Sequence, residues 1–159
     1  MVTTLPSTAL TGKTATMTGI NVGEDDLTVY DEGTWTPVVK IDTTAITVAG
    51  STTGQFTRIG NVVYFTCNLA FNRATNTGTL SVEGLPVASA GAALSAVSIR
   101  PNDKIDCDPP LSASVNGGET KIALYKSPTT TSENLGGMSD TQIPASTQVN
   151  MIITGFYFV

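Results

Sequence analysis

Apolar and polar residues alternate over much of this chain, most regularly in VVYFTCNLAF, residues 62–71. Successive side chains of a β-strand point to opposite faces, so this stretch would place two sets of residues on two faces. One face is wholly apolar and is expected to point into a core: Val63, Phe65, Cys67, Leu69 and Phe71. The other face is mixed: Val62, Tyr64, Thr66, Asn68 and Ala70.

Similar short runs, separated by turn residues, predict an all-β domain. The segment before residue 62 is joined to it through Ile59-Gly60-Asn61, a Gly-Asn sequence typical of a tight hairpin. Further strands are expected in TWTPVVKIDTTAITVAG, TLSVEGLPVAS, AALSAVSIR, LSASV and KIALYKS, with a short helix as the alternative for AALSAVSIR. A final strand pair, VNMIIT and FYFV, is expected to be divided by Gly155. The predicted fold class is an antiparallel β-sandwich, jelly-roll-like, with no internal repeat.

Residues 1–29 differ from the rest, because their isolated apolar residues follow no period among many Thr, Ser and Gly residues. Such a segment buries too little surface to fold alone, so we expect an extended N-terminal arm or linker. The predicted domains are this arm and a β-sandwich over residues 30–159. The acidic residues near their boundary indicate a solvated linker, with a calcium site as the alternative: Glu24, Asp25, Asp26, Asp31 and Glu32.

Composition adds an expectation about assembly. The chain has 159 residues, enough for one domain, and only 13% of them are charged. An average soluble protein has about 25%. A lone β-domain with so few charges would expose much uncharged surface, so we expect other subunits to cover part of it.

Charge and hydropathy exclude two classes of partner. The net charge is −5 and the eight Lys and Arg residues are scattered, so no basic stripe is available for nucleic acid. No apolar run is long enough to cross a bilayer, and the amino terminus lacks the pattern of a signal peptide. Cys67 and Cys107 are therefore predicted to be free thiols rather than a disulfide.

The residue types restrict catalysis. Histidine is absent, which excludes Ser-His-Asp and Cys-His arrangements and most zinc sites. Cys67 lies on an apolar face and is expected to be inert. Glycoside hydrolysis needs only two carboxylates, but Asp31 and Glu32 would point in opposite directions. We predict no catalytic activity and no cofactor; a polysaccharide-degrading enzyme remains the distant alternative.

One acidic loop is a weak calcium candidate. Asp103, Asp106 and Asp108 could offer oxygen ligands, but the loop lacks the glycine and the closing glutamate of an EF-hand. A polar loop before Pro109-Pro110 explains the same residues, since Asp commonly initiates turns. We therefore predict no metal site.

Polar loops offer better candidates for binding. Segments 72–78, 101–110, 116–120 and 128–142 carry short hydrogen-bonding side chains that suit hydroxyl-rich ligands. Tyr125 and Tyr30 could supply a stacking face. The candidate receptor or glycan contacts are Asn72, Arg73, Asn76, Asn116, Tyr125 and Asn134. Ordinary β-turns select the same residue types, so this alternative stays open.

Several motifs together carry a family resemblance. YDEGTWTPVV, which contains the single tryptophan, is followed by GQFTRIGNVVYFTCNLAF, by TLSVEGLPVAS and finally by an aromatic terminal strand. This series resembles the carboxy-terminal domain of many bacteriophage tail fibres and tailspikes. The resemblance covers Asp31 to about Ser89. It departs from the usual pattern at Phe56, where tyrosine is common, and does not extend to the loops from 101 to 142.

The resemblance implies a β-sandwich that forms a homotrimer at the distal end of a fibre and attaches to the host. The implied partners are host cell-surface polysaccharide or an outer-membrane receptor, and other virion tail proteins through the arm. The implied location is the virion tail, after synthesis in the bacterial cytoplasm. In tailspikes the depolymerase activity normally lies in a separate upstream domain. The chain, which begins at Met1 with a short arm, is expected to be an excised tip or a small virion protein.

Trp35 has three interpretations: a sugar-stacking platform, a core residue or a clasp between subunits. Its position beside Pro37 favours packing at the domain base or trimer interface, because lone large aromatic residues are usually buried anchors. The residues predicted for this role are Trp35, Pro37, Phe156, Tyr157 and Phe158. The alternative function is structural: a head-decoration, cement or baseplate protein that links virion subunits without binding a receptor.

Overall fold

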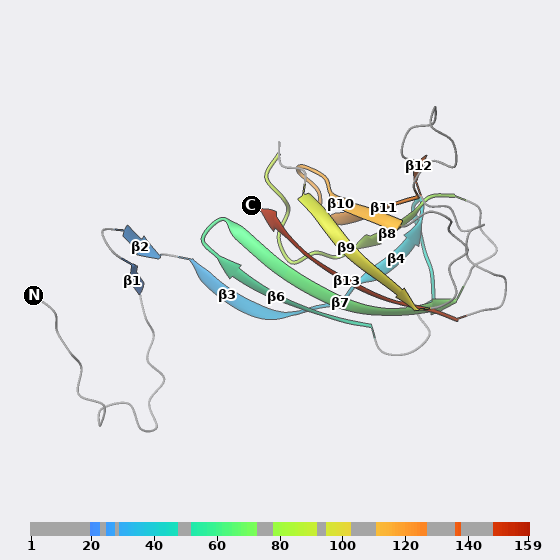
Figure 1. Cartoon of the computed structure of the whole chain (residues 1–159), viewed down its shortest axis with the longest axis horizontal. Coiled ribbons are helices and arrows are strands. Elements are labelled where there is room, and N and C mark those ends of the chain that lie inside the picture. The colour runs from blue at the N-terminus through green and yellow to red at the C-terminus, as the bar shows by residue number, and fades with distance from the viewer. Residues whose placement is uncertain are drawn as a thin grey trace, which may run out of the picture.

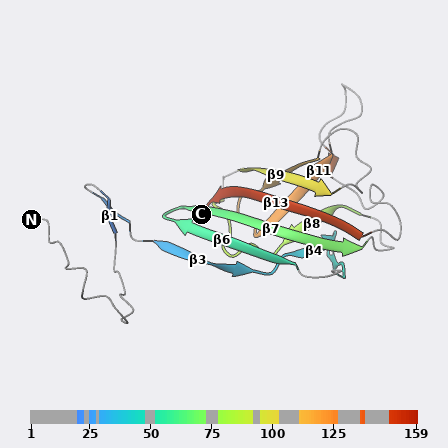
Figure 2. The same ribbon diagram turned by 60° about the horizontal axis from the view of Figure 1, so that its bottom comes forward.

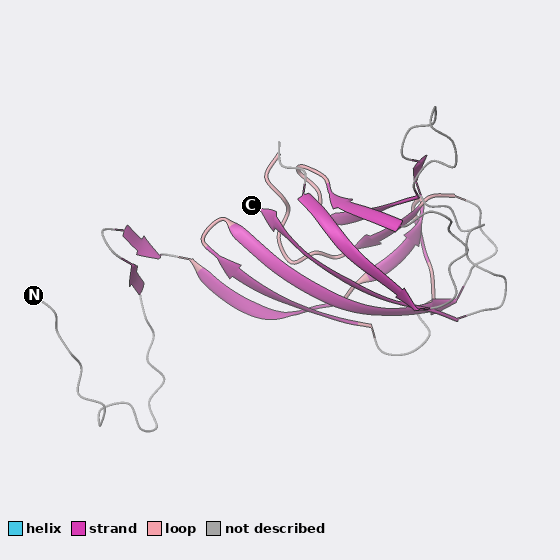
Figure 3. Cartoon of the chain, viewed as in Figure 1, coloured by secondary structure: helices cyan, strands magenta, loops and turns pink. Residues whose placement is uncertain are grey.

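A computed structural model describes residues 20–22, 25–27, 29–47, 52–72, 78–91, 95–102, 111–126, 136–137 and 148–159. These residues form strands and connecting turns without any helix, as Figure 3 shows. All strand pairs are antiparallel. The predicted all-β, antiparallel fold class is therefore confirmed.

The strands are β1 (Ile20–Val22), β2 (Asp25–Leu27), β3 (Tyr30–Trp35), β4 (Val38–Ile41), β5 (Thr44–Ala45), β6 (Thr53–Ile59), β7 (Val62–Asn72), β8 (Leu80–Glu83), β9 (Ser95–Asn102), β10 (Leu111–Val115), β11 (Lys121–Lys126), β12 (Gly136–Gly137) and β13 (Gln148–Phe158). Ten of them form one sheet in the order β3-β6-β7-β13-β9-β10-β11-β8-β4-β5, and β12 pairs with β11. The sheet curls into two layers, one with β3, β6, β7, β13 and β9, the other with β10, β11, β8 and β4 (Figures 1 and 2).

The predicted arm contains a small sheet of its own. β1 and β2 pair with each other, and neither is hydrogen-bonded to the main sheet. Figure 1 shows this pair beyond the start of β3, away from the curled sheet. The large sheet begins at Tyr30, the first residue of β3.

The β6–β7 hairpin follows the sequence prediction closely. Ile59 pairs with Val62, and Gly60 lies between them with a φ of 59°, a left-handed conformation that glycine adopts without steric cost. The face of β7 predicted to be apolar is buried throughout, and its residues form the centre of the core. Of the two alternatives for residues 92–100, the strand is correct, since β9 includes Ser95–Asn102.

The predicted division of the last strand at Gly155 is wrong. β13 continues from Gln148 to Phe158 without interruption and pairs with β7 along its full length. Gly155 lies opposite Phe65, and a side-chain carbon at this position would lie 3.4 Å from the Phe65 ring. The glycine therefore provides space for an aromatic ring inside the sheet and does not make a turn.

Trp35 lies where the chain crosses between the two edges of the sheet. β3 and β4 are consecutive in sequence, yet β3 is one edge strand and β4 lies near the other edge, so Thr36 and Pro37 connect the two layers. The Trp35 indole packs edge-on against Phe65, with ring centroids 6.3 Å apart. It also lies against Gly54, where any side chain would collide with it. This corner closes the curled sheet around the core.

The strand register separates the domain into two ends. At one end, which we call the entry end, the Gly60 N–H donates to Val29 and the Val159 N–H donates to Asn61, at 2.8 Å each. The turn at Gly118 belongs to the same end. The Gly118 N–H donates to the Ser89 carbonyl, and the N–H of Ala90, the residue after Ser89, donates to the Phe158 carbonyl. At the other end, the loop end, Asn72 pairs with Gln148, Asn102 with Asn150 and Leu111 with Lys126.

Candidate binding surfaces

An exposed aromatic patch occupies the entry end of the outer face of the β3–β6–β7–β13 layer. The cross-strand register places Tyr30 beside Ile59, and Tyr64 beside Phe156, with Phe158 two residues further along β13. These five residues, which define the patch, are each between 41% and 55% exposed. Large contiguous apolar surface of this kind marks interaction sites in soluble proteins.

Three of the rings in the patch, Tyr64, Phe156 and Phe158, contact one another in sequence. The Tyr64 and Phe156 centroids are 6.0 Å apart, and Phe156 and Phe158 make an edge-on contact at 6.0 Å. The Tyr30 hydroxyl donates to Glu32 at 2.7 Å, and this hydrogen bond raises the Tyr30 pKa above its ordinary value. The patch is thus a preformed apolar surface with one acidic residue at its edge.

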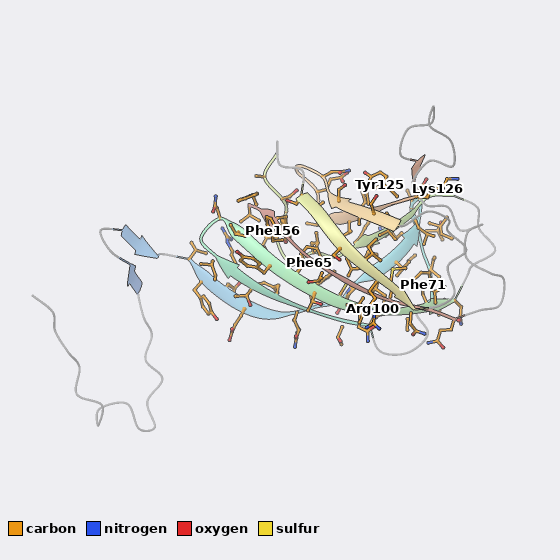
Figure 4. The ribbon with its side chains drawn as sticks, viewed as in Figure 1. Phe65, Phe71, Arg100, Tyr125, Lys126 and Phe156 are labelled. Carbon is orange, nitrogen blue, oxygen red and sulfur yellow. The ribbon has the colours of Figure 1, made fainter. Side chains whose placement is uncertain are left out.

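Beyond the patch, the same face is mostly uncharged and polar. Gln55 and Thr66 are cross-strand partners at its centre, and Thr154 pairs with Thr66 from the other side. Two shallow grooves of about 290 and 310 Å³ follow this strip. Arg100 and Ile152, also partners, lie further toward the loop end; Figure 4 labels Arg100 there and Phe156 near the C-terminus.

The residues predicted for the trimer interface or domain base fall into two groups. Trp35, Pro37 and Tyr157 are buried within one chain, whereas Phe156 and Phe158 belong to the exposed patch. The Tyr157 hydroxyl donates to the Val87 carbonyl at 2.9 Å, and burial raises the Tyr157 pKa. The Trp35 indole N–H is buried and has no hydrogen-bond partner among the described residues. The buried position of Trp35 does not suit an exposed stacking platform.

The candidate receptor contacts do not form a single cluster. Asn72 is exposed at the loop end, whereas Asn116 lies at the entry end, on the β10–β11 turn. Tyr125 lies on the outer face of β11 (Figure 4). Ser114 Oγ donates to Asn116 Oδ1 at 2.9 Å and is 3.4 Å from the Tyr125 hydroxyl, which connects these two candidates. Outside the described residues are Arg73, Asn76 and Asn134.

Tyr30 and Tyr125 lie on the outer faces of opposite layers, so they do not form one stacking face. Asp31 and Glu32 are in β3, not in a linker, and face opposite sides of the sheet, with Arg58 and Thr57 as their respective partners. This separation argues against a catalytic pair at these two positions.

The weak calcium candidates lie outside the described residues: Asp103, Asp106 and Asp108. In the described ranges, no group of three acidic, cysteine or histidine side chains could hold a metal ion.

Cys67 is a free, buried thiol whose pKa is raised by burial to about 12, so it is a poor nucleophile at neutral pH. Cys107 is not among the described positions. Nowhere in the described structure is there a helix of the length and apolarity that would cross a bilayer.

Comparison with known proteins gives one informative similarity. No family model matches the sequence, and no curated protein matches it. The fold is shared with part of a bacteriophage tailspike. That structure is the crystal structure of Dettilon tailspike protein (gp208), with a TM-score of 0.66 and 23% sequence identity over 81% of this chain. The chain spans 24% of the tailspike chain, so the similarity concerns about a quarter of that protein.

Sequence reasoning did not assign Tyr30, Ile59 and Tyr64 to an exposed apolar surface shared with Phe156 and Phe158. The alternation in β7 already places Tyr64 on the outer face, and an exposed tyrosine in a strand was the available signal. The grouping of all five residues depends on the register of four strands, which the local pattern does not contain.

Proposed function

We propose that this chain is a non-catalytic domain of a bacteriophage tail fibre or tailspike that forms a homotrimer and attaches the virion to its host. The observation that carries the proposal is the exposed aromatic patch, on a fold shared with part of a tailspike. Association of the chains through Tyr64, Phe156 and Phe158 would remove this apolar surface from water, which is the main driving force of protein association.

The geometry supports a direction for the assembly. The patch lies at the entry end, which the chain reaches directly from the predicted arm. If the subunits pack at this end, their N-terminal arms would extend toward the other virion tail proteins. The loop end, with Asn72 exposed, would then point away from the virion toward a host polysaccharide or an outer-membrane receptor.

The solution mass tests the trimer directly. Light scattering of the wild-type chain is expected to give about three times 16.5 kDa. The double variant Phe156→Ser, Phe158→Ser should give a monomer with an unchanged far-UV circular dichroism spectrum, because both side chains are exposed. Ile152→Ser is the matched control, since Ile152 is also exposed on the same face of β13 but lies outside the patch. A monomeric wild type would overturn the proposed assembly.

Attachment needs a separate measurement. Fluorescently labelled wild-type protein is expected to bind intact cells of some strains in a Gram-negative panel, and their extracted surface polysaccharide should compete. A trimer that binds none of these cells but forms a stable complex with purified virion proteins would favour the purely structural function. Release of reducing ends from the polysaccharide would contradict the non-catalytic assignment.

A further inference from the structure

A shallow groove crosses the layer opposite the aromatic patch, on the outer face of β8 and β11. Its volume is about 200 Å³. Ser81 and Ala123 are direct cross-strand partners on its floor, and the groove is open there because both side chains are small. The full lining is Asp42, Thr79, Leu80, Ser81, Asn116, Lys121 and Ala123.

The floor of the groove carries a hydroxyl that no described protein group binds. Ser81 is only 8% exposed, and its side chain makes no hydrogen bond to any residue within the described ranges. Among the described residues, the fully buried side-chain polar atoms without a partner are Trp35 Nε1, Ser95 Oγ and Glu119 Oε2, so the Ser81 hydroxyl is accessible from the groove. A ligand hydroxyl in the groove could exchange a hydrogen bond with this accessible Ser81 hydroxyl.

The walls offer both donors and acceptors. Asp42 is held by two hydrogen bonds to Thr79: its N–H donates to the Thr79 carbonyl, and its Oδ1 accepts from the Thr79 N–H, both at 2.9 Å. Asn116 accepts from Ser114 through Oδ1, which leaves its amide N–H groups as donors. Lys121 supplies an ammonium group. Sugar hydroxyls both donate and accept, so they match such a mixed lining.

The charges around the groove are largely balanced. Lys121 pairs with Glu119 at 3.1 Å, and Lys40 pairs with Glu83 at 2.6 Å on the same face. Asp42 has no ion pair to a lysine or arginine among the described residues. With paired cations and an additional carboxylate, the groove disfavours phosphates and other anions.

A phenol lies next to this lining. Tyr125 is two residues beyond Ala123 on β11 and therefore shares its outer face. Its hydroxyl is linked through Ser114 to Asn116. The ring provides partly exposed apolar surface beside the polar lining, a combination that suits the apolar face and the hydroxyl edge of a sugar.

We propose that this groove binds a neutral saccharide unit of the size of one sugar ring, with Ser81, Asn116 and Asp42 as the hydrogen-bonding residues. The proposal rests on the proposed attachment function, which it extends by naming the ligand class and the site. The groove lies on the layer opposite the aromatic patch, so association through the patch would leave it open.

Ligand-observed saturation-transfer NMR on the wild-type chain tests this site. The probes are neutral hexoses, 6-deoxyhexoses and N-acetylhexosamines at millimolar concentration. At least one sugar is expected to show transfer. Ala123→Leu should abolish the signal by filling the hollow, and Ser81→Ala should weaken the affinity about threefold to tenfold through one lost hydrogen bond. Ser98→Ala, on the opposite layer, should leave it unchanged.

Transfer to none of these sugars would overturn the proposal, as would transfer that persists undiminished in Ala123→Leu. Stronger binding of inorganic phosphate than of any sugar would also overturn it. The solution mass reports on the trimer independently. A monomer whose groove binds sugar would reject only the proposed assembly, and a trimer whose groove binds no sugar would reject only this site.

Discussion

Replacement of Trp35 by alanine is expected to destabilise each chain by several kilocalories per mole. The indole is only 7% exposed, contacts Phe65 edge-on and covers Gly54 at the corner that joins the two layers. Its removal deletes buried apolar surface and leaves a cavity, which for Trp→Ala costs about 3–5 kcal/mol. Because domains are stable by only about 5–15 kcal/mol, this loss is a large part of the total.

Denaturant unfolding followed by far-UV circular dichroism measures this loss, since the variant lacks the single tryptophan of the chain. The measurement is best made in the Phe156→Ser, Phe158→Ser background, where the chain is expected to be monomeric. There the loss should not depend on protein concentration, because the contacts of the indole lie within one chain. Trp35→Phe should lose less, since it keeps an aromatic ring at the corner.

The opposite result would refute this reasoning. If Trp35→Ala leaves the unfolding midpoint of the monomeric background unchanged and lowers only the mass of the otherwise wild-type protein, the indole is a clasp between subunits. Gly54→Ala provides an independent check, because its added methyl group would collide with the indole. It should destabilise the monomeric background in the same direction as Trp35→Ala.

Three further predictions concern single groups. Tyr157→Phe should cost about 1 kcal/mol in denaturant unfolding, because it loses the hydrogen bond to the backbone. The folded-state pKa of Tyr157 is raised above 10.0, so the stability linked to this group is present below pH 10.0 and is lost as the pH rises through the folded-state pKa. The Tyr157→Phe variant should lack this loss at high pH. Gly60→Ala should destabilise by about 1 kcal/mol because of its left-handed φ, whereas Gly91→Ala, with open space and no positive φ, should be neutral in the same assay. In a Cys107→Ser background, a thiol reagent should label Cys67 only after unfolding; labelling of the native protein at the rate of free cysteine would contradict its burial.

The sequence alone determined the local structure. The alternation in β7 correctly assigns Val63 and Phe71 to the core, because the period of two is a property of the strand itself. The Gly60-Asn61 turn is also local, since a two-residue hairpin needs a residue that tolerates a positive φ. The composition likewise excludes histidine-dependent chemistry before any coordinates are known.

Only the tertiary structure decided which surfaces these elements make. Gly155 was predicted to divide a strand pair, but it faces the ring of Phe65, a residue far away in sequence. The aromatic patch and the groove likewise combine residues from strands distant in sequence, such as Ser81 with Ala123. Alternation determines the face that a side chain occupies, whereas its neighbours depend on strand order and register. These are set by packing of the whole chain, which no local pattern encodes.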